Sequence, residues 1–143
     1  MVDTKEFPVL YVLMRNDLAS MNNGKASAQA CHASDAFNKL MLEEFGCDDK
    51  TSVAYWPRLY WKWKTETTQG FGTVLTLAVN EVQMRTAVDI AQKFGVPATI
   101  IHDPTYPLVD GDFVHFLPLD TCAVVFGDKN YVGQLVNKFP LHP

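Results

Sequence analysis

A continuous apolar run near the N-terminus is the feature that most constrains the fold. Pro8–Met14 (PVLYVLM) has no polar position, which is typical of a strand buried on both faces in the middle of a sheet. Polar residues Arg15–Asp17 close the run, and the loop Met21–Gly24 leads into a stretch with helical periodicity. The sequence therefore predicts a strand–loop–helix unit with a buried strand.

The helix of this unit is expected from about Lys25 to Phe45, with Asn22 or Asn23 as its N-cap. At about 100° per residue, its small and apolar side chains form one stripe, consisting of Ala26, Ala30, Ala33, Phe37 and Leu40. The N-terminal half of the stripe is alanine, so the helix can approach a sheet closely. Polar side chains line one flank of the stripe: Lys25, Gln29 and His32.

Further elements follow from the same patterns. Strands are expected at Thr73–Val79, Val96–Ile101 and Thr121–Phe126, with a short extra strand at Phe113–Leu117, and helices at Glu81–Phe94 and Tyr131–Phe139. His102–Gly111 carries two prolines and an Asp-Gly pair and is predicted to be a loop, and Gly46–Gly72 is predicted to be irregular or to hold a short helix. The class is α/β, with a small mixed sheet, helices on both faces, and a βαβ crossover through Glu81–Phe94.

The bulk composition narrows the function classes. A chain of 143 residues is expected to form one domain, residues 1–143. Its net charge of −4 is unlike that of a general nucleic-acid coat protein, so an RNA contact needs a local basic patch, or there is no RNA partner. Three cysteines make no disulfide framework, and without CxxC or HExxH spacing we expect no metal. No signal segment or membrane-length apolar run is seen, which favours the cytoplasm.

The start of the predicted helix has the chemistry of an anion site. Free N–H groups at a helix start favour negative charge, and Gly24 lets the backbone come close. Lys25 adds a cation, while Gln29 and His32 add an amide and an imidazole on the same flank. This set can hold a phosphate or a developing oxyanion. The alternative is a solvated lysine and a histidine hydrogen-bonded beside the core.

A second polar cluster, His102-Asp103, directly follows the third predicted strand, where open α/β sheets tend to bind ligands. Asp103 can orient a water or pair with Lys25, or it can simply cap the turn that begins at Pro104. His102 and His115 have no third ligand at convincing spacing, so they do not predict a metal site.

The segment Trp56–Lys64 contains all three tryptophans together with Arg58, Lys62 and Lys64. Such a mixture can stack unpaired bases and meet phosphates. The alternative, which we favour, is a lid on the core or a dimer surface. Cys31 lies beside His32, but adjacent helical positions point about 100° apart, so we expect a buried structural thiol rather than a nucleophile.

Taken together, these residues resemble the archaeal/eukaryotic-type (type II) peptidyl-tRNA hydrolase family. The resemblance rests on Arg15-Asn16-Asp17-Leu18, Met21, Gly24-Lys25 and Ala28-Gln29-Ala30-Cys31-His32-Ala33, and it continues at Ile100–Asp103 and Thr121-Cys122. AQACHA and the closing Val132-Gly133-Gln134 and Lys138-Phe139 are similar to a divergent branch, the peptidyl-tRNA hydrolase domain-containing proteins. The resemblance covers most of the chain outside about 46–70 and 107–120.

The resemblance implies a four-stranded mixed sheet flanked by helices, often in a homodimer. It also implies metal-free cleavage of the ester that joins a peptidyl group to tRNA. Asp103, helped by Thr121 or Thr105, is then expected to position and activate a water, with Gln29 orienting substrate or water. Lys25 and the helix start are expected to stabilise the oxyanion. The remaining residues are expected to support or bind substrate: Asn23, Gly24, Arg15, His32, Arg58, Lys62 and Lys64.

The chain departs from the family pattern inside the motif region. Asn23 stands where the family has the first of two lysines, and Cys31 replaces a common serine. Pro107 falls on a threonine position, with Thr105 as a substitute, and the stretch from Asp103 to Thr121 is longer than usual. Two other functions therefore stay open: a non-catalytic RNA- or protein-binding module, and an ester or amide hydrolase acting on a small substrate.

Overall fold

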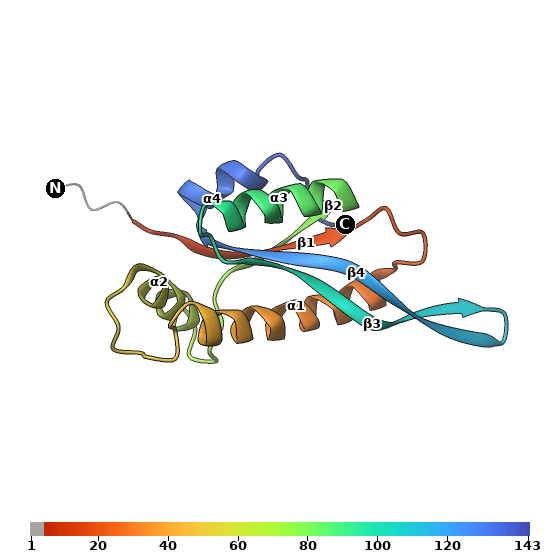
Figure 1. Ribbon diagram of the computed structural model, residues 1–143, viewed down its shortest axis with the longest axis horizontal. Helices are drawn as coiled ribbons and strands as arrows, with labels where there is room; N and C mark the ends of the chain where they lie inside the picture. Colours follow the sequence, from red (N-terminus) through yellow and green to blue (C-terminus); the bar gives the residue numbers. More distant parts are fainter. Residues whose placement is uncertain (1–4) are drawn as a thin grey trace.

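A four-stranded mixed sheet separates two helical layers in the computed structural model, which describes residues 5–143 (Figure 1). In chain order the elements are β1 (Pro8–Arg15), α1 (Asn23–Glu44), α2 (Tyr55–Lys64), β2 (Val74–Val79), α3 (Glu81–Lys93), β3 (Ala98–Asp110), β4 (Phe113–Asp128) and α4 (Lys129–Val136). Helices α1 and α2 cover one face, and α3 and α4 cover the other. The predicted fold class is confirmed.

Strand β1 is buried along its whole length, as its apolar run predicts. Side chains alternate across the sheet, so Leu10 and Val12 pack in the core under α1 and α2, while Tyr11 and Leu13 pack in the core under α3 and α4. The strand is therefore the shared wall of two hydrophobic cores.

The strand order is β2-β1-β4-β3. Strand β1 is parallel to β2 and antiparallel to β4, and β4 is antiparallel to β3. Helix α3 does cross over from β2 to β3, but those strands lie at opposite edges of the sheet. The adjacent parallel pair is instead β1 and β2, joined through α1 and α2.

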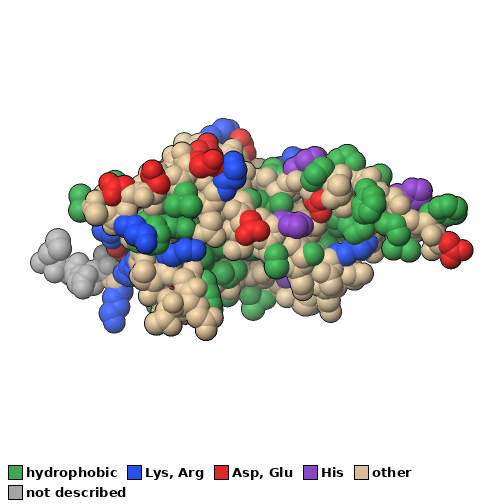
Figure 2. All heavy atoms as spheres, turned by 90° about the horizontal axis from the view of Figure 1, so that it is seen from below, with side chains coloured by type: hydrophobic (Ala, Val, Ile, Leu, Met, Phe, Trp, Pro, Cys, Tyr) green, Lys and Arg blue, Asp and Glu red, His purple; other side chains and the backbone are tan. Residues whose placement is uncertain are grey.

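The prediction of a loop at His102–Gly111 was wrong. Strand β3 continues to Asp110, the expected short strand at Phe113–Leu117 is the first part of β4, and their pairing reaches Asp110↔Phe113. Pro104 and Pro107 suggested a loop, yet proline is tolerated in a strand when its missing N–H falls on an edge or at a bulge. The resulting hairpin projects from the body, and hydrophobic side chains gather on it (Figures 1 and 2).

Helix α1 begins as expected, because the Asn22 side chain accepts a hydrogen bond from the N–H of Lys25 at 2.9 Å. Its buried face consists of Gln29, Ala33, Phe37 and Met41. Gln29 therefore faces the sheet instead of lying on the flank of the helix. Cys31 is exposed, so the expectation of a buried thiol at this position was wrong.

The tryptophan segment forms α2 and closes one core. Trp63 is buried and packs edge-on against Phe37 and Phe126, and its indole N–H donates to the carbonyl of Thr73 at 2.8 Å. Trp61 donates to the carbonyl of Cys47. This arrangement agrees with a lid on the core. Within residues 5–143, no helix combines the length and the hydropathy required to cross a bilayer.

Gly72 is needed for the packing of α2. A Cβ atom at this position would lie 2.4 Å from the Trp63 carbonyl oxygen and 2.5 Å from its ring. We expect Gly72→Ala to lower the free energy of unfolding by about 1–3 kcal/mol, because the backbone or the indole must move. Urea unfolding measures the change. Gly24→Ala is the matched control, since its Cβ meets nothing closer than 3.6 Å, and an equal loss in both variants would contradict this explanation.

Candidate active site

Two irregularities in the β3–β4 pairing surround Asp103. Ile101 pairs with Cys122 but His102 pairs with Asp120, which leaves Thr121 as an extra residue on β4. A second register shift, between Asp103 and Tyr106, leaves an extra residue on β3. Bulges of this kind re-aim side chains and are common beside active sites. Here they allow Thr121 and Asp103 to reach the same side chain on α1.

That side chain is Gln29, which lies at the centre of a short chain of hydrogen bonds. Thr121 Oγ1 donates to Gln29 Oε1 at 2.6 Å, and Gln29 Nε2 donates to Asp103 Oδ2 at 2.6 Å. All three residues are buried. The Thr105 backbone N–H donates to the other carboxylate oxygen, Asp103 Oδ1, at 2.9 Å. The carboxylate is therefore held from both sides, and the expected turn-capping role coexists with a place in the cluster.

The environment of Asp103 favours its charged form. Burial acts to raise the pKa of the carboxyl, but the hydrogen bonds from Gln29 and from Thr105, with the nearby charge of His32, together hold the pKa below its ordinary value. Asp103 is thus ionised at neutral pH. The neighbouring Cys122 thiol is inert by comparison, because burial raises its pKa to about 12.

The contact between α1 and β3, which we call the seam, includes the bond from Gln29 to Asp103 and a second contact made by Lys25. Its Nζ donates to the carbonyl of Pro107 at 2.7 Å and lies 5.0 Å from the centre of the Tyr106 ring. Tyr106 is fully buried. Lys25 and Gln29 are one turn apart on α1, where side chains at i and i+4 share a face. The ammonium, which has further N–H donors, therefore lies on the same side of α1 as Gln29 and contacts the same strand, β3.

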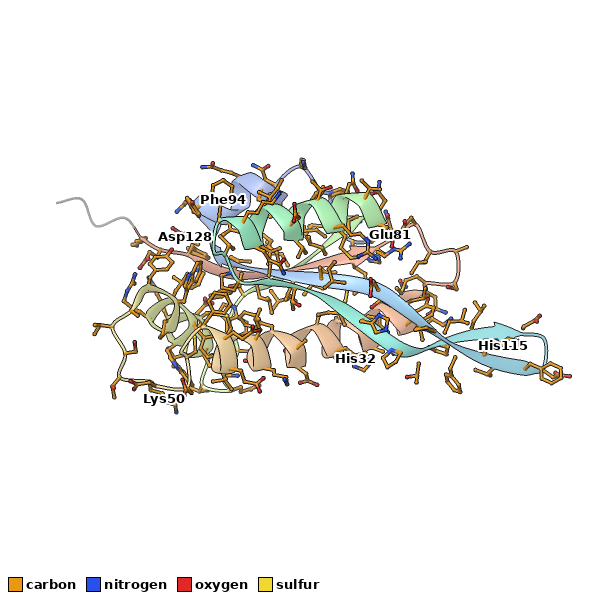
Figure 3. All side chains as sticks on the ribbon, viewed as in Figure 1. His32, Lys50, Glu81, Phe94, His115 and Asp128 are labelled. Carbon is orange, nitrogen blue, oxygen red and sulfur yellow. The ribbon has the colours of Figure 1, made fainter. Side chains whose placement is uncertain are left out.

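The first turn of α1 carries Asn23 and Gly24, both exposed. The Asn23 carbonyl accepts a hydrogen bond from Ser27 at 2.8 Å. His32 lies one turn beyond Gln29, is exposed, and acts to lower the pKa of Asp103. Figure 3 shows His115 on the projecting hairpin, away from His32 on α1. Among residues 5–143, no three His, Cys, Asp or Glu side chains gather in a way that could hold a metal ion.

The other predicted substrate-binding cations lie elsewhere. Arg15 is buried and forms two hydrogen bonds to the Asp17 carboxylate and one to the Asp120 carbonyl. Arg58 pairs with Glu6 on the exposed side of α2. Helix α2 packs on the C-terminal half of α1, whereas Gln29 is near its start (Figure 1). On the same helix, Lys62 is exposed and Lys64 donates to Asn38 at 3.3 Å.

Sequence reasoning missed the neighbours that organise the seam. Asp120 accepts from Arg85 at 2.7 Å and contacts His102 Nδ1 at 2.7 Å. The hydrogen bond from Arg85, followed by that from His102, lowers the pKa of Asp120. Tyr106 and the carbonyl of Pro107 were missed as contacts of Lys25. None of these had a sequence signal, because each depends on the length and register of the hairpin.

The bond from Gln29 to Asp103 can be tested by Gln29→Leu. Burial remains but the hydrogen bond is lost, so the pKa of Asp103 should rise. In the native protein, the stabilisation from ionised Asp103 is present above the unfolded-state pKa and is lost as the pH falls through the lower folded-state pKa. In the variant that stabilisation should shrink and should disappear at higher pH. Carboxyl NMR titration and urea unfolding across acid pH measure both changes.

The matched control is Gln134→Leu, which changes an exposed glutamine on α4. It should leave the Asp103 titration unaltered, and the loss of a buried partner should cost about 1–3 kcal/mol only in Gln29→Leu. An unchanged Asp103 titration in Gln29→Leu would show that the hydrogen bond does not set its charge.

Comparison with known protein families matches nearly the whole chain to one family. The family described as peptidyl-tRNA hydrolase PTH2 matches residues 8–142, nearly the whole chain. That range includes β1, the start of α1, Asp103 and Thr121. A search of curated proteins finds no match. The extent of the family match, together with the four-stranded fold, shows that this chain belongs to the PTH2 family of peptidyl-tRNA hydrolases.

Proposed function

We propose that the protein hydrolyses the ester bond between a peptidyl or N-blocked aminoacyl group and tRNA, releasing free tRNA. One observation carries the proposal: the hydrogen-bonded series Thr121–Gln29–Asp103 ends on an ionised carboxylate of β3, the strand whose Pro107 carbonyl holds Lys25. The family match supports the same reaction. We propose the cytosol as the compartment, because translation supplies the substrate there and the three cysteines are free thiols.

In the proposed reaction, Asp103 accepts a hydrogen bond from the attacking water and directs its oxygen at the ester carbonyl carbon. The water oxygen adds to that carbon, and the bond to the 3′ ribose oxygen breaks. The water proton passes to the ribose oxygen, with Asp103 as the carrier, because a carboxyl of low pKa releases a proton readily. The products are a free carboxylic acid and tRNA with a 3′ hydroxyl.

Gln29 and Thr121 act by position in this scheme. The Thr121 hydroxyl proton is engaged by Gln29 Oε1, which turns the amide N–H₂ toward Asp103. Because Thr121 is fully buried, we propose that it orients Gln29 and does not touch the water. Thr105 holds the second carboxylate oxygen through its backbone N–H. These contacts fix the carboxylate before substrate arrives.

Lys25 is proposed to stabilise the negative charge that develops on the carbonyl oxygen. One N–H of its ammonium is held by the Pro107 carbonyl, and the others can point toward the oxyanion. The root of the hairpin thus sets the direction of the lysine. The exposed first turn of α1, with Asn23 and Gly24, is proposed to bind the terminal phosphate of the tRNA through its free N–H groups.

The scarcity of free positive charge among the predicted tRNA-binding residues favours a second function, a non-catalytic binding module. Arg15 and Arg58 are engaged in ion pairs, Asn23 is uncharged, and the net charge is −4. These observations suit a binding module that keeps the fold without the chemistry. Such a module would retard tRNA in a gel without freeing it from its peptide, so one release assay separates the two functions.

Lys25→Ala and Asp103→Asn test the chemistry. We expect each to lower the turnover of purified peptidyl-tRNA by about 100-fold or more, because each removes a charge that acts in the transition state. Free tRNA separated from peptidyl-tRNA on an acid gel is the readout, and circular dichroism checks the fold. Lys93→Ala, at the exposed end of α3, is the matched control and should retain native turnover. Native turnover in a folded Lys25→Ala protein would sink the mechanism.

A further inference from the structure

Strand β3 forms one edge of the sheet, and there is a hollow on each side of that edge. The hollow on the α1 side has a volume of about 390 Å³, and the hollow on the α3 side about 450 Å³. Ile100 lines both. We refer to these two hollows, which share Ile100 as a lining residue, together as the trough along β3.

The backbone of β3 presents hydrogen-bonding groups to this trough. Phe126 N–H donates to the Pro97 carbonyl, and residues facing the partner alternate along an antiparallel pair. Residues 97, 99 and 101 therefore face β4, while 98 and 100 face outward. The Ala98 carbonyl confirms this direction, because it accepts from the Gln92 side chain at 3.0 Å. The N–H and C=O of Ile100 accordingly point into the trough.

The opposite edge of the sheet is treated differently. The C-terminal segment lies along β2, where Ala78 N–H donates to the Pro140 carbonyl at 2.8 Å and His142 N–H donates to the Thr76 carbonyl at 2.9 Å. Leu77 and Leu141 form an antiparallel bridge. Exposed sheet edges attract added strands, and proteins usually cover them. Within residues 5–143, the chain covers the β2 edge with its own backbone, whereas the two hollows lie along the β3 edge.

The trough leads to the candidate active site. Helix α1 and β3 run in opposite directions (Figure 1). The α1-side hollow is therefore lined at one end by His32 and His102 and toward the other end by Glu43 and Thr99. His32 lies about one helical turn beyond Gln29 on α1, and His102 directly precedes Asp103 on β3. An extended chain bound along β3 would thus have one end at the hydrolytic cluster.

We propose that the trough binds the peptidyl part of the substrate as an added β-strand, an inference that rests on the proposed function. Backbone hydrogen bonds to Ile100 hold the peptide, and its alternating side chains enter the two hollows. Recognition through the backbone is independent of peptide sequence, which suits an enzyme whose substrates carry varied nascent peptides. The α1-side hollow carries three carboxylates, Asp35, Glu43 and Glu44, against one cation, Lys39, so it favours basic peptide side chains.

The first test compares substrates that share one tRNA. One carries a single N-acetylated amino acid, and the other an acetylated oligopeptide long enough to span β3, ending in the same residue. We expect KM to be about 10-fold lower for the oligopeptidyl substrate, because it gains backbone hydrogen bonds. N-methylation of every second amide of the oligopeptide removes hydrogen-bond donors along one of its edges. Methylation of the amides that face β3 should abolish the lower KM, whereas methylation of the other amides should leave it unchanged.

The second test fills the trough. Thr86→Trp places a large side chain in the α3-side hollow, and we expect the KM ratio of the two substrates to fall toward one. Val53→Trp, at a position 90% exposed in the loop before α2, is the matched control and should preserve the ratio. Asp35→Lys should reverse the preference for basic over acidic peptides, whereas Asp48→Lys, an exposed change outside the trough, should not.

Different results overturn the two proposals. Equal KM values for both substrates in an active wild-type protein would overturn the trough and leave the hydrolase function standing. Failure of the folded protein to hydrolyse either substrate would overturn the function. In that case, amide NMR of the protein with the free acetylated oligopeptide tests whether the trough binds peptide. Unshifted amide signals from residues 98–101 would reject peptide binding there. Concentration-dependent protection of the Ile100 amide without peptide would also reject it, by showing that a second copy occupies the edge.

Discussion

Burial of β1 on both faces is the constraint on which the rest of the structure depends. All eight of its residues are buried, so it must have neighbours on both edges and helices on both faces. Strands β4 and β2 are its neighbours on the two edges, and the two helical layers cover its two faces. The strand order leaves β3 at the edge, where Gln29 on α1 contacts Asp103 and Lys25 contacts Pro107.

A buried polar chain across this seam costs free energy unless every member is paired. Thr121, Gln29 and Asp103 meet that condition, and within the described residues no buried side-chain nitrogen or oxygen lacks a partner. The same bonds that stabilise the packing of α1 on β3 also keep the Asp103 carboxyl charged. The Gln29 side chain therefore serves both the stability of the fold and the charge state of Asp103.

The hairpin formed by the ends of β3 and β4 has a root that packs on the body and an outer part that is exposed. Its root packs on the body through Tyr106 and holds Lys25 through the carbonyl of Pro107. Its outer part has apolar side chains on the surface, with Val109 66%, Phe113 72% and Phe116 64% exposed. A two-stranded ribbon with little packing gains little stability of its own. The hairpin thus supplies a fixed wall to the site at one end and an exposed apolar surface at the other (Figure 2).

The sequence by itself determined the central strand, the capped helix α1, the α/β class and the family, because apolar periodicity, helix capping and motif spacing are local properties. It also placed Lys25, Gln29, Asp103 and Thr121 in one candidate set. Only the tertiary structure decided that Gln29 is buried between Thr121 and Asp103, that Arg15 and Arg58 are held in ion pairs, and that His102–Gly111 is strand. The physical reason is strand pairing: the register of β3 on β4, with its two bulges, depends on contacts between residues distant in sequence, which no local pattern encodes.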